Sequence, residues 1–356
     1  MAAIALSDIT SALATLFEDQ LVAQWNRAVV LTKLLPVVQG SAQNINWDIK
    51  GTDGSVAHGS SMIAEGGTVS TFSDDALTKA TLSFTNYYDA FGISGLAMNA
   101  AAATGNPAGL ADLFGEKFMD SVTRLAKNLN QEWYTGTGAS NHIAGLVDPT
   151  NGALKASGTY AGVAKGSVTL FQGNELANGG SPRPLSFQIM RDTIRSVYVA
   201  SGTTPDLIVC DPIQFARYGM LFGEQRRYMA EMTTAGGTYK LDGGFKALEF
   251  DGIPVVQDKD ASSGQMLFLN TNHVRIQQLP DMLADANQPG AIGKAAKLKL
   301  TGTPETQLGA GTTSLSARLL PLAIVGDNYT FQLVIYPQLQ VRRPNSCAML
   351  VDLVSA

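Results

Sequence analysis

Apolar residues recur at three- and four-residue intervals in several stretches of the chain, which is the spacing of a helix with one buried face. The first stretch lies within residues 1–30, and the longest follows Asn106-Pro107 and ends at Gly136. Shorter stretches run from Leu185 to Ala200 and onward from Asp211-Pro212. Because Asn or Asp before Pro is typical of a helix start, the pattern predicts a long helix across the body of the protein and shorter helices beside it.

Alternating apolar and polar residues, the period of a half-buried strand, occupy Gln43 to Lys50 and recur from Lys79 to Tyr88. A short apolar run from Asp206 to Cys210 predicts a buried strand, and Asp251-Gly252 predicts a tight turn. Further predicted strands cover Phe245 to Phe250, Ile253 to Gln257, Met266 to Asn270, His273 to Leu279, Tyr329 to Tyr336, Leu339 to Arg343 and Ala348 to Val354, with a short one near Leu298. Helices and strands together predict an α+β protein.

The segment from Gly51 to Ala76 is rich in Gly, Ser, Thr and Asp and carries hardly any core-forming residues. Structureless loops longer than about 12–15 residues are uncommon in compact domains. As a projecting two-stranded ribbon, each arm of this segment would reach roughly 40 Å at about 3.3 Å per residue. An isolated ribbon is only marginally stable in water, so we expect it to lie on another surface, most simply that of a neighbouring subunit.

The composition favours a protein that places much of its surface against other chains. Only 15% of the 356 residues are charged, against about 25% in an ordinary soluble domain, while 45% are hydrophobic. A net charge of −5 argues against a chain that grips nucleic acid by neutralising phosphates. No apolar run approaches the ~20 residues of a membrane span, the N-terminus lacks the pattern of a signal peptide, and two cysteines make no disulfide framework. We therefore expect a protein of a reducing cytoplasm, or of something assembled there.

Motifs for catalysis, metal binding or cofactor binding are not found in the sequence. The three histidines, His58, His142 and His273, are scattered, and neither a phosphate loop nor a nucleophile elbow occurs. The run from Asp258 to Ser262 begins like a calcium loop but lacks the required Gly and Glu at its sixth and twelfth positions, so we interpret it as a turn. Cys210, at the end of an apolar strand, is interpreted as an inert core thiol. We expect no cofactor and no metal.

Two segments of the chain carry a resemblance to a known family. The first is Asp206 to Pro212, a strand that leads into a proline-started helix, and the second is Phe250-Asp251-Gly252-Ile253-Pro254-Val255-Val256, followed by the turn of Asp258 and Asp260. They resemble the A-domain of the major capsid proteins of tailed bacteriophages, which have the Hong Kong 97 fold. The resemblance implies a capsid fold with an N-arm, an E-loop, a spine helix, a peripheral domain and an axial domain.

The order of the remaining segments fits this family over nearly the whole chain. The resemblance implies an N-terminal arm at 1–40, an extended E-loop with its base strands at 41–88, a peripheral domain with the spine helix at 89–138, an axial domain with insertions at 139–314, and a return to the peripheral sheet at 315–356.

The family implies assembly as the function and no enzyme activity. Its members build an icosahedral shell of hexamers and pentamers in the bacterial cytoplasm, and the shell receives double-stranded DNA through a portal. A separate scaffolding protein is expected because the arm-like helix starts near Ser7, and a decoration protein is left open. DNA contacts would be weak and sequence-blind, since the chain is acidic. The residues we expect at subunit interfaces are Trp25, Lys50, Asp53, His58, Glu65, Asp74, Lys79 and the basic doublets Arg226-Arg227 and Arg342-Arg343.

Some family members weld their subunits by a Lys–Asn isopeptide bond. The E-loop-like region offers Lys50 and Lys79, and the C-terminal region offers Asn328 and Asn345. Nothing beyond residue identity selects them, so we expect a noncovalent shell. Two alternatives stay open: an encapsulin-type compartment that holds cargo enzymes, and a soluble α+β enzyme with an unrecognised carboxylate site.

Overall fold

A computed structural model of the chain describes residues 30–40, 42–50, 65, 77–103, 107–139, 141–221, 231–234, 237–240, 247–279, 297–299, 316–321 and 327–355. The helix expected within residues 1–30 lies outside this part of the chain. No helix within it combines the length and apolar content that crossing a membrane requires.

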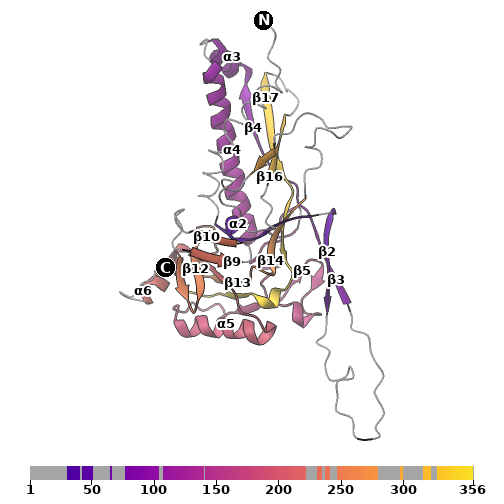
Figure 1. The fold of residues 1–356 in the computed structure, drawn as a ribbon, viewed down its shortest axis with the longest axis vertical. Coiled ribbons are helices and arrows are strands. Elements are labelled where there is room, and N and C mark those ends of the chain that lie inside the picture. Colours follow the sequence, from indigo (N-terminus) through magenta and orange to yellow (C-terminus); the bar gives the residue numbers. More distant parts are fainter. Residues whose placement is uncertain are drawn as a thin grey trace.

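The longest element is α4 (Pro107–Thr135), with the bounds that its sequence pattern predicts. Its 29 residues span about 43 Å at about 1.5 Å per residue. The helix runs alongside a four-stranded sheet in the order β15 (Lys297–Lys299), β16 (Ser316–Pro321), β17 (Asn328–Ile335) and β4 (Tyr87–Ser94), as Figure 1 shows. The short helix α3 (Gly95–Ala103) connects β4 to α4.

An aromatic cluster joins α4 to this sheet. Phe114 and Phe118 of α4 contact Phe91 of β4, with ring centroids 5.5 and 6.2 Å from the Phe91 centroid. Phe331 of β17 stacks on Phe91 at 5.3 Å. The apolar stripe continues along α4 to Trp133, which is fully buried. Burial of this stripe, together with the bond of Arg124 of α4 to Asp89 of β4 (2.7 Å), holds the helix to the sheet.

The second half of the molecule is a six-stranded mixed sheet in the order β11 (Ala247–Phe250), β12 (Ile253–Gln257), β8 (Leu207–Cys210), β13 (Met266–Leu269), β19 (Ala348–Leu350) and β7 (Asn174–Leu176). Every residue of β8, β13 and β19 is buried. Alternate residues serve different cores: Ile208 and Phe268 lie in the core under two helices, whereas Val209 and Leu267 lie in the core shared with α4.

The helices on this sheet are α5 (Phe187–Ser201) and α6 (Pro212–Leu221), and both begin at side-chain caps. The Ile189 N–H donates to Ser186 Oγ (3.3 Å), and the Gln214 N–H donates to Asp211 Oδ1 (2.8 Å). The cap before Pro212 is the one that the sequence predicts. Between β11 and β12, Asp251 and Gly252 both have positive φ, as the predicted tight turn requires.

A three-stranded sheet lies between these two halves. In it β1 (Val37–Gln39) runs parallel to β14 (Val274–Gln278), and β14 pairs antiparallel with β18 (Pro337–Val341). The short helix α2 (Leu31–Leu34) precedes β1. A separate two-stranded ribbon, β2 (Asn44–Lys50) with β3 (Leu77–Ser83), projects from the body (Figure 1).

Several short elements complete the described fold. Residues 136–184, which the sequence left unassigned, contain the pair β5 (Thr159–Tyr160) and β6 (Val163–Ala164), the 3₁₀ turn η2 (Thr169–Phe171), and β7. The hairpin β9 (Glu231–Thr234) and β10 (Gly237–Lys240) follows α6, and η5 (Pro344–Ser346) precedes β19.

One sequence-based expectation needs correction. The strand predicted from Lys79 to Tyr88 is two strands, β3 and β4, which residues 84–86 separate. The break arises because Thr85 turns to the body, where its N–H and hydroxyl both donate to Pro337 O (3.4 and 2.8 Å). Among the described residues after 315, β16 and β17 lie in the sheet with β4, and β18 and β19 lie in the other two sheets.

Candidate subunit interface

The ribbon β2–β3 has two chemically different faces. Its register pairs Ile45 with Leu82 and Trp47 with Ala80 on the face toward the body, and all four are buried or partly buried. The opposite face pairs Asn44 with Ser83, Asn46 with Thr81, Asp48 with Lys79 and Lys50 with Leu77. The alternation predicted for residues 43–50 is confirmed, and the second face of β2 consists of exposed polar side chains.

Cross-strand hydrogen bonds stiffen this outer face. Ser83 Oγ donates to Asn44 Oδ1 (3.0 Å), and Thr81 Oγ1 donates to Asn46 Oδ1 (2.9 Å). Toward the far end, Leu77 is 64% exposed. A flat surface with short polar groups, a large exposed apolar side chain and two lysines has the mixed chemistry of a contact between proteins rather than of a catalytic cleft.

The root of the ribbon is tied to the body by three contacts of different kinds. The Thr81 N–H donates to Ala161 O (2.9 Å), a backbone bond between β3 and the segment of β5 and β6. Gln338 Nε2 donates to Ser83 O (2.7 Å), and Thr85 bonds to Pro337 O. Two of these contacts reach β18, so the ribbon depends on a strand more than 250 residues away along the chain.

The segment under the ribbon contains a buried cation. Lys165 is fully buried, and its Nζ donates to three backbone carbonyl oxygens, those of Gly152 (2.7 Å), Ala153 (3.0 Å) and Lys155 (2.6 Å). Burial lowers the pKa of Lys165 to about 7, while the nearby Glu175 carboxylate acts to raise it. The lysine thus closes a loop of residues 152–165 that supports β5 and β6.

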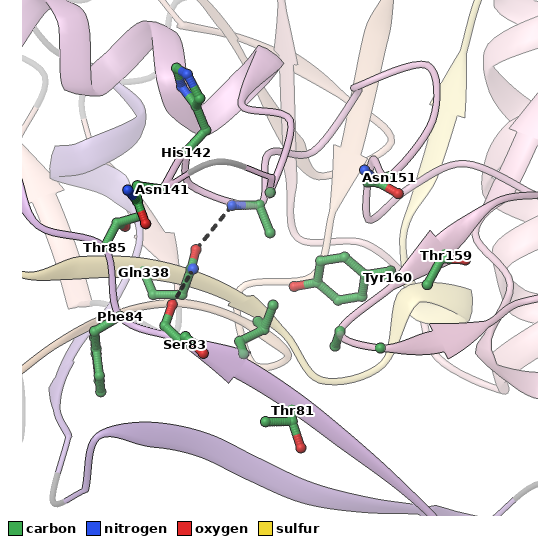
Figure 2. A pocket seen from close by; sticks show the side chains of 15 residues that line it. Thr81, Ser83, Phe84, Thr85, Asn141, His142, Asn151, Thr159, Tyr160 and Gln338 are labelled. Atoms are coloured by element: carbon green, nitrogen blue, oxygen red, sulfur yellow. Dashed lines mark hydrogen bonds between the residues drawn. The ribbon is translucent and has the colours of Figure 1, made fainter.

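A cavity of about 390 Å³ opens between the ribbon root and residues 138–162 (Figure 2). Gln338 stands at its base, where it accepts from the Ala144 N–H (3.1 Å) and donates to Ser83 O. His142 is the histidine among the described residues around the cavity. Its Nδ1 lies 3.1 Å from a carboxylate oxygen of Glu132. The lining offers hydroxyl and amide groups but no nucleophile beside a base, which acid–base or covalent catalysis requires.

The turn that resembles a calcium loop has a structural role. It is closed by the Ala261 N–H donating to Asp258 O (3.3 Å), as the sequence-based interpretation predicts. The buried Asp258 carboxylate accepts from Tyr134 OH (2.8 Å) and Asn130 Nδ2 (3.1 Å) of α4, and burial raises the pKa of Tyr134. Within the described ranges, no group of three or more His, Cys, Asp or Glu side chains could hold a metal ion. Asp258 therefore fastens α4 to the end of β12.

The expected interface residues fall into two groups. Lys50 and Lys79 lie on the outer face of the ribbon, Glu65 and Arg342 are exposed, and Arg343 is half-buried with Nη2 donating to Ser201 O (2.8 Å). The structure therefore brings Lys50 and Lys79 together but not with the arginines. Trp25, Asp53, His58, Asp74, Arg226 and Arg227 lie outside the described residues.

Sequence reasoning missed a set of exposed apolar side chains on the helices of the six-stranded sheet. Met220 of α6 is 70% exposed, with Ile213 and Leu221 on the same side, and Val199 of α5 is 79% exposed beside Tyr198. In the sequence, these side chains have the same spacing as the apolar residues of a buried helix face. The signal that could have found them is that α6 has apolar residues on both faces, which a surface helix does not need.

Comparisons with known proteins agree on the fold. No family model matches the sequence, and no curated protein matches it either. Among solved structures, the chain is similar to the capsid asymmetric unit of cyanophage A-1(L), with 23% identity and a TM-score of 0.67 over 90% of this chain and 91% of that one. It is also similar to the holo-encapsulin complex of Synechococcus elongatus, with 11% identity and a TM-score of 0.52 over 92% and 88%.

A third similar structure is that of Mycobacterium phage Bobi, with 13% identity and a TM-score of 0.50 over 91% of this chain and 90% of that one. Each likeness extends over nearly the whole of both chains, so the long helix, the sheets and the ribbon are compared together. The chain therefore has the Hong Kong 97 fold, the fold that the segments at 206–212 and 250–256 resemble in sequence.

Proposed function

We propose that this chain is the major capsid protein of a tailed bacteriophage. Copies of it assemble, as hexamers and pentamers, into an icosahedral shell that encloses double-stranded DNA. The shell is built in the bacterial cytoplasm with a separate scaffolding protein and a portal, and its contacts with DNA are weak and sequence-blind. The observation that carries this proposal is the likeness to the cyanophage capsid chain, which covers about nine tenths of both chains.

The ribbon supports the proposal in physical terms. Its inner face lies on the body of its own subunit, and its outer face, with Lys50, Leu77 and Lys79, lies against solvent in a single chain. A second copy placed against that face would remove the exposed Leu77 from water, at about 25 cal/mol per Å² of apolar area. Many such modest contacts, repeated by symmetry, close a shell although none is strong alone.

The apolar patches on α5 and α6 support the same proposal. Large exposed apolar side chains that gather on a surface mark sites of interaction, and Met220 and Val199 lie exposed on two different helices, α6 and α5. A ring of copies needs two different patches on each subunit, since each contact is head-to-tail. We propose that these patches contribute to contacts within a hexamer or pentamer.

A noncovalent shell remains our proposal. The Asn345 side chain is buried and its amide donates to Ala200 O (3.2 Å), which argues against its reacting with a lysine of another copy. Asn328 is exposed at the start of β17. The test is denaturing electrophoresis of assembled particles. A monomer band supports noncovalent contacts, whereas a ladder lost on Lys50→Arg, Lys79→Arg or Asn328→Asp substitution supports an isopeptide bond.

Electron microscopy of the purified chain, expressed with and without candidate scaffolding genes from the same locus, tests the main proposal. Closed icosahedral particles are expected. A chain that sediments as a monomer under all these conditions contradicts the proposal and favours the rival class, a soluble α+β enzyme.

An encapsulin-type shell is the second candidate, because the holo-encapsulin complex has the same fold. The two candidates differ in what the particle holds. Particles recovered from the native source after nuclease treatment contain double-stranded DNA in the first case and a cargo enzyme in the second. We favour the phage shell because the TM-score of 0.67 to the phage capsid chain exceeds that of 0.52 to the encapsulin.

A further inference from the structure

Two aspartates of the turn after β12 lie together against the last turns of α4. Asp258 is 1% exposed, and the side chain of Asp260 is 12% exposed. Both accept from one group, Asn130 Nδ2, which lies 3.3 and 3.1 Å from the two Asp258 oxygens and 2.8 Å from Asp260 Oδ2. An amide group with two hydrogens therefore faces three carboxylate oxygens. We term this group of Asp258, Asp260 and Asn130 the acidic junction.

The acidic junction has little positive charge beside it. Among the described residues, one basic group pairs with it: Lys259 Nζ lies 4.0 Å from Asp260 Oδ1, on a side chain that is 53% exposed. The other donors to Asp258 are neutral, namely the Tyr134 hydroxyl (2.8 Å) and the Asp260 N–H (3.0 Å). Burial and then the Asp258 charge raise the pKa of Tyr134. Buried carboxylates are ordinarily paired with a cation or bound to a metal, and an exposed lysine at this distance contributes little.

The carboxamide that points into the acidic junction has an unmatched oxygen. Asn130 is fully buried, and its Oδ1 has no hydrogen-bond partner among the described residues. A buried acceptor without a partner lowers the stability of the fold. A half-turn about the Cβ–Cγ bond exchanges Nδ2 and Oδ1 and places Oδ1 among the three carboxylate oxygens. That second arrangement is stable with a cation at its centre, because oxygens that carry like charge otherwise repel one another.

The spacing of the turn agrees with a cation site. Asp258, Asp260 and Ser262 stand at the first, third and fifth positions of a calcium-loop pattern. The turn alone lacks the Gly and the Glu of that pattern, and fewer than three acidic side chains meet at the junction. Neutral oxygens come from α4 instead, where Asn130 and Tyr134 stand one helical turn apart and both bond to Asp258. The tertiary structure thus supplies oxygen ligands that the local motif lacks.

Calcium is the divalent ion that fits this set of groups. The two carboxylates balance its charge, and Ca²⁺ accepts irregular sets of carboxylate, amide and water oxygens. Mg²⁺ demands near-octahedral geometry and keeps several of its waters, for which the buried side of the junction at Asp258 leaves little access. With only two charged ligands, a dissociation constant of roughly 10⁻⁴–10⁻³ M is expected, the range of weak calcium modules.

We propose that the acidic junction binds Ca²⁺, with the Asp258 and Asp260 carboxylates and the turned Asn130 carboxamide as its protein ligands. The ion strengthens the contact between α4 and the six-stranded sheet, because Asn130 belongs to the helix and both aspartates follow β12. This inference goes beyond the proposed function and does not depend on it, since all the ligands belong to one subunit.

Isothermal titration of Ca²⁺ into the full chain, after treatment with a chelator, tests the proposal. Asp260→Asn is expected to weaken binding at least tenfold, because one of the two charged ligands is lost. Asn130→Asp is expected to tighten it at least tenfold, because a third carboxylate replaces a neutral oxygen. Asp192→Asn, which changes an exposed carboxylate of α5, is the control and is expected to leave the dissociation constant within twofold. A wild-type chain that shows no binding of Ca²⁺ overturns the proposal.

Thermal unfolding separates ion binding from the relief of charge repulsion. Ca²⁺ at about 10 mM, above the expected dissociation constant, should raise the Tm of the wild-type chain by about 2 °C. The same addition is expected to leave the Tm of Asp260→Asn unchanged. If Ca²⁺ leaves the wild-type Tm unchanged while Asp260→Asn raises it, loss of a charge alone relieves the junction, and the proposal is overturned.

Terbium luminescence shows where the ion binds. Tb³⁺ takes the same oxygen ligands as Ca²⁺, and it emits strongly when an adjacent aromatic ring transfers excitation energy to it. Tyr134 is such a ring, because its hydroxyl bonds to Asp258. Emission that Ca²⁺ displaces is expected from the wild-type chain, and its loss is expected in Asp260→Asn. Emission that persists unchanged in this variant places the ion elsewhere and overturns the proposal.

Failure of this inference and failure of the proposed function are distinguishable. A chain that forms icosahedral particles but binds no Ca²⁺ overturns the inference, and the capsid function stands. A chain that binds Ca²⁺ at the acidic junction but forms no particles supports the inference and contradicts the capsid function.

Discussion

The six-stranded sheet and the ribbon β2–β3 are both β-structure, yet they obtain their stability in different ways. In the sheet, β8, β13 and β19 are buried on both faces, with α5 and α6 on one side and the core shared with α4 on the other. In the ribbon only the inner face is covered, and the outer face carries polar side chains and an exposed Leu77.

This difference shows which region of the chain obtains its full stabilisation within one subunit and which does not. A sheet buried on both faces gains its full hydrophobic stabilisation within one subunit. A two-stranded ribbon covered on one face gains about half as much per residue, and two strands alone are marginal in water. By our proposal the other half of the stabilisation comes from neighbouring copies, so folding of this region is coupled to assembly.

The largest expected effect separates assembly from folding. Deleting residues Gly54 to Asp74 leaves a short connection between β2 and β3, which is a normal hairpin loop length. We expect a folded subunit whose free energy of unfolding is unchanged, together with complete loss of particles in electron microscopy. Replacing the same residues by a Gly-Ser sequence of equal length is the control for loop length. Normal particles from the deletion variant would contradict the coupling of this region to assembly.

A pair of truncations compares the two regions directly. Phe268→Ala, in the fully buried centre of β13, is expected to lower the free energy of unfolding by about 3–5 kcal/mol, because a large cavity forms in a core that cannot collapse. Leu77→Ala, on the outer face of the ribbon, is expected to change it by less than about 0.5 kcal/mol. Chemical denaturation of the isolated subunit measures both, and similar losses would show that the ribbon is covered within one chain.

Two tryptophans sharpen the comparison. Trp133 Nε1 of α4 donates to the buried Thr32 hydroxyl (2.8 Å), whereas Trp47 Nε1 of β2 is buried without a partner among the described residues. Trp133→Phe is expected to cost about 1–3 kcal/mol because it leaves the Thr32 hydroxyl unpaired. Trp47→Phe removes an equal volume but no hydrogen bond, so it is expected to cost distinctly less. Thermal unfolding of both variants measures the two losses of stability. Equal decreases in Tm would contradict the difference in hydrogen bonding between the two indole N–H groups.

The smallest effect concerns the segment between the two regions. Burial lowers the pKa of Lys165 to about 7 in the folded chain, while an unfolded lysine titrates near 10.4. Between about pH 7 and pH 8.5 the unfolded chain thus binds a proton that the folded chain releases, so the free energy of unfolding rises with pH, by at most about 1.4 kcal/mol per unit. Denaturation at both pH values measures this slope. Lys165→Met is expected to abolish it, and a slope that persists in that variant would assign the effect to another group.

The sequence by itself determined the elements whose signals are local. The cap of Asp211 before Pro212, the turn of Asp251-Gly252 and the long stripe from Phe114 to Trp133 involve residues within a few positions of one another. Their geometry depends on backbone preference and on periodic burial, both readable from a short window. The general fold followed for the same reason, because the turns at 250–256 and the order of elements resemble one family.

Only the tertiary structure decided the features that depend on residues far apart along the chain. Examples are the break at Thr85, which needs Pro337 O, and the hydrogen bond from Tyr134 to Asp258. The sequence also did not predict the exposed apolar side chains of α6. The spacing of apolar residues shows where they lie around a helix but not which side other elements cover. Burial and charge pairing depend on contacts between residues that are far apart in the sequence. Such contacts form only when the chain packs, so a short window of sequence does not predict them.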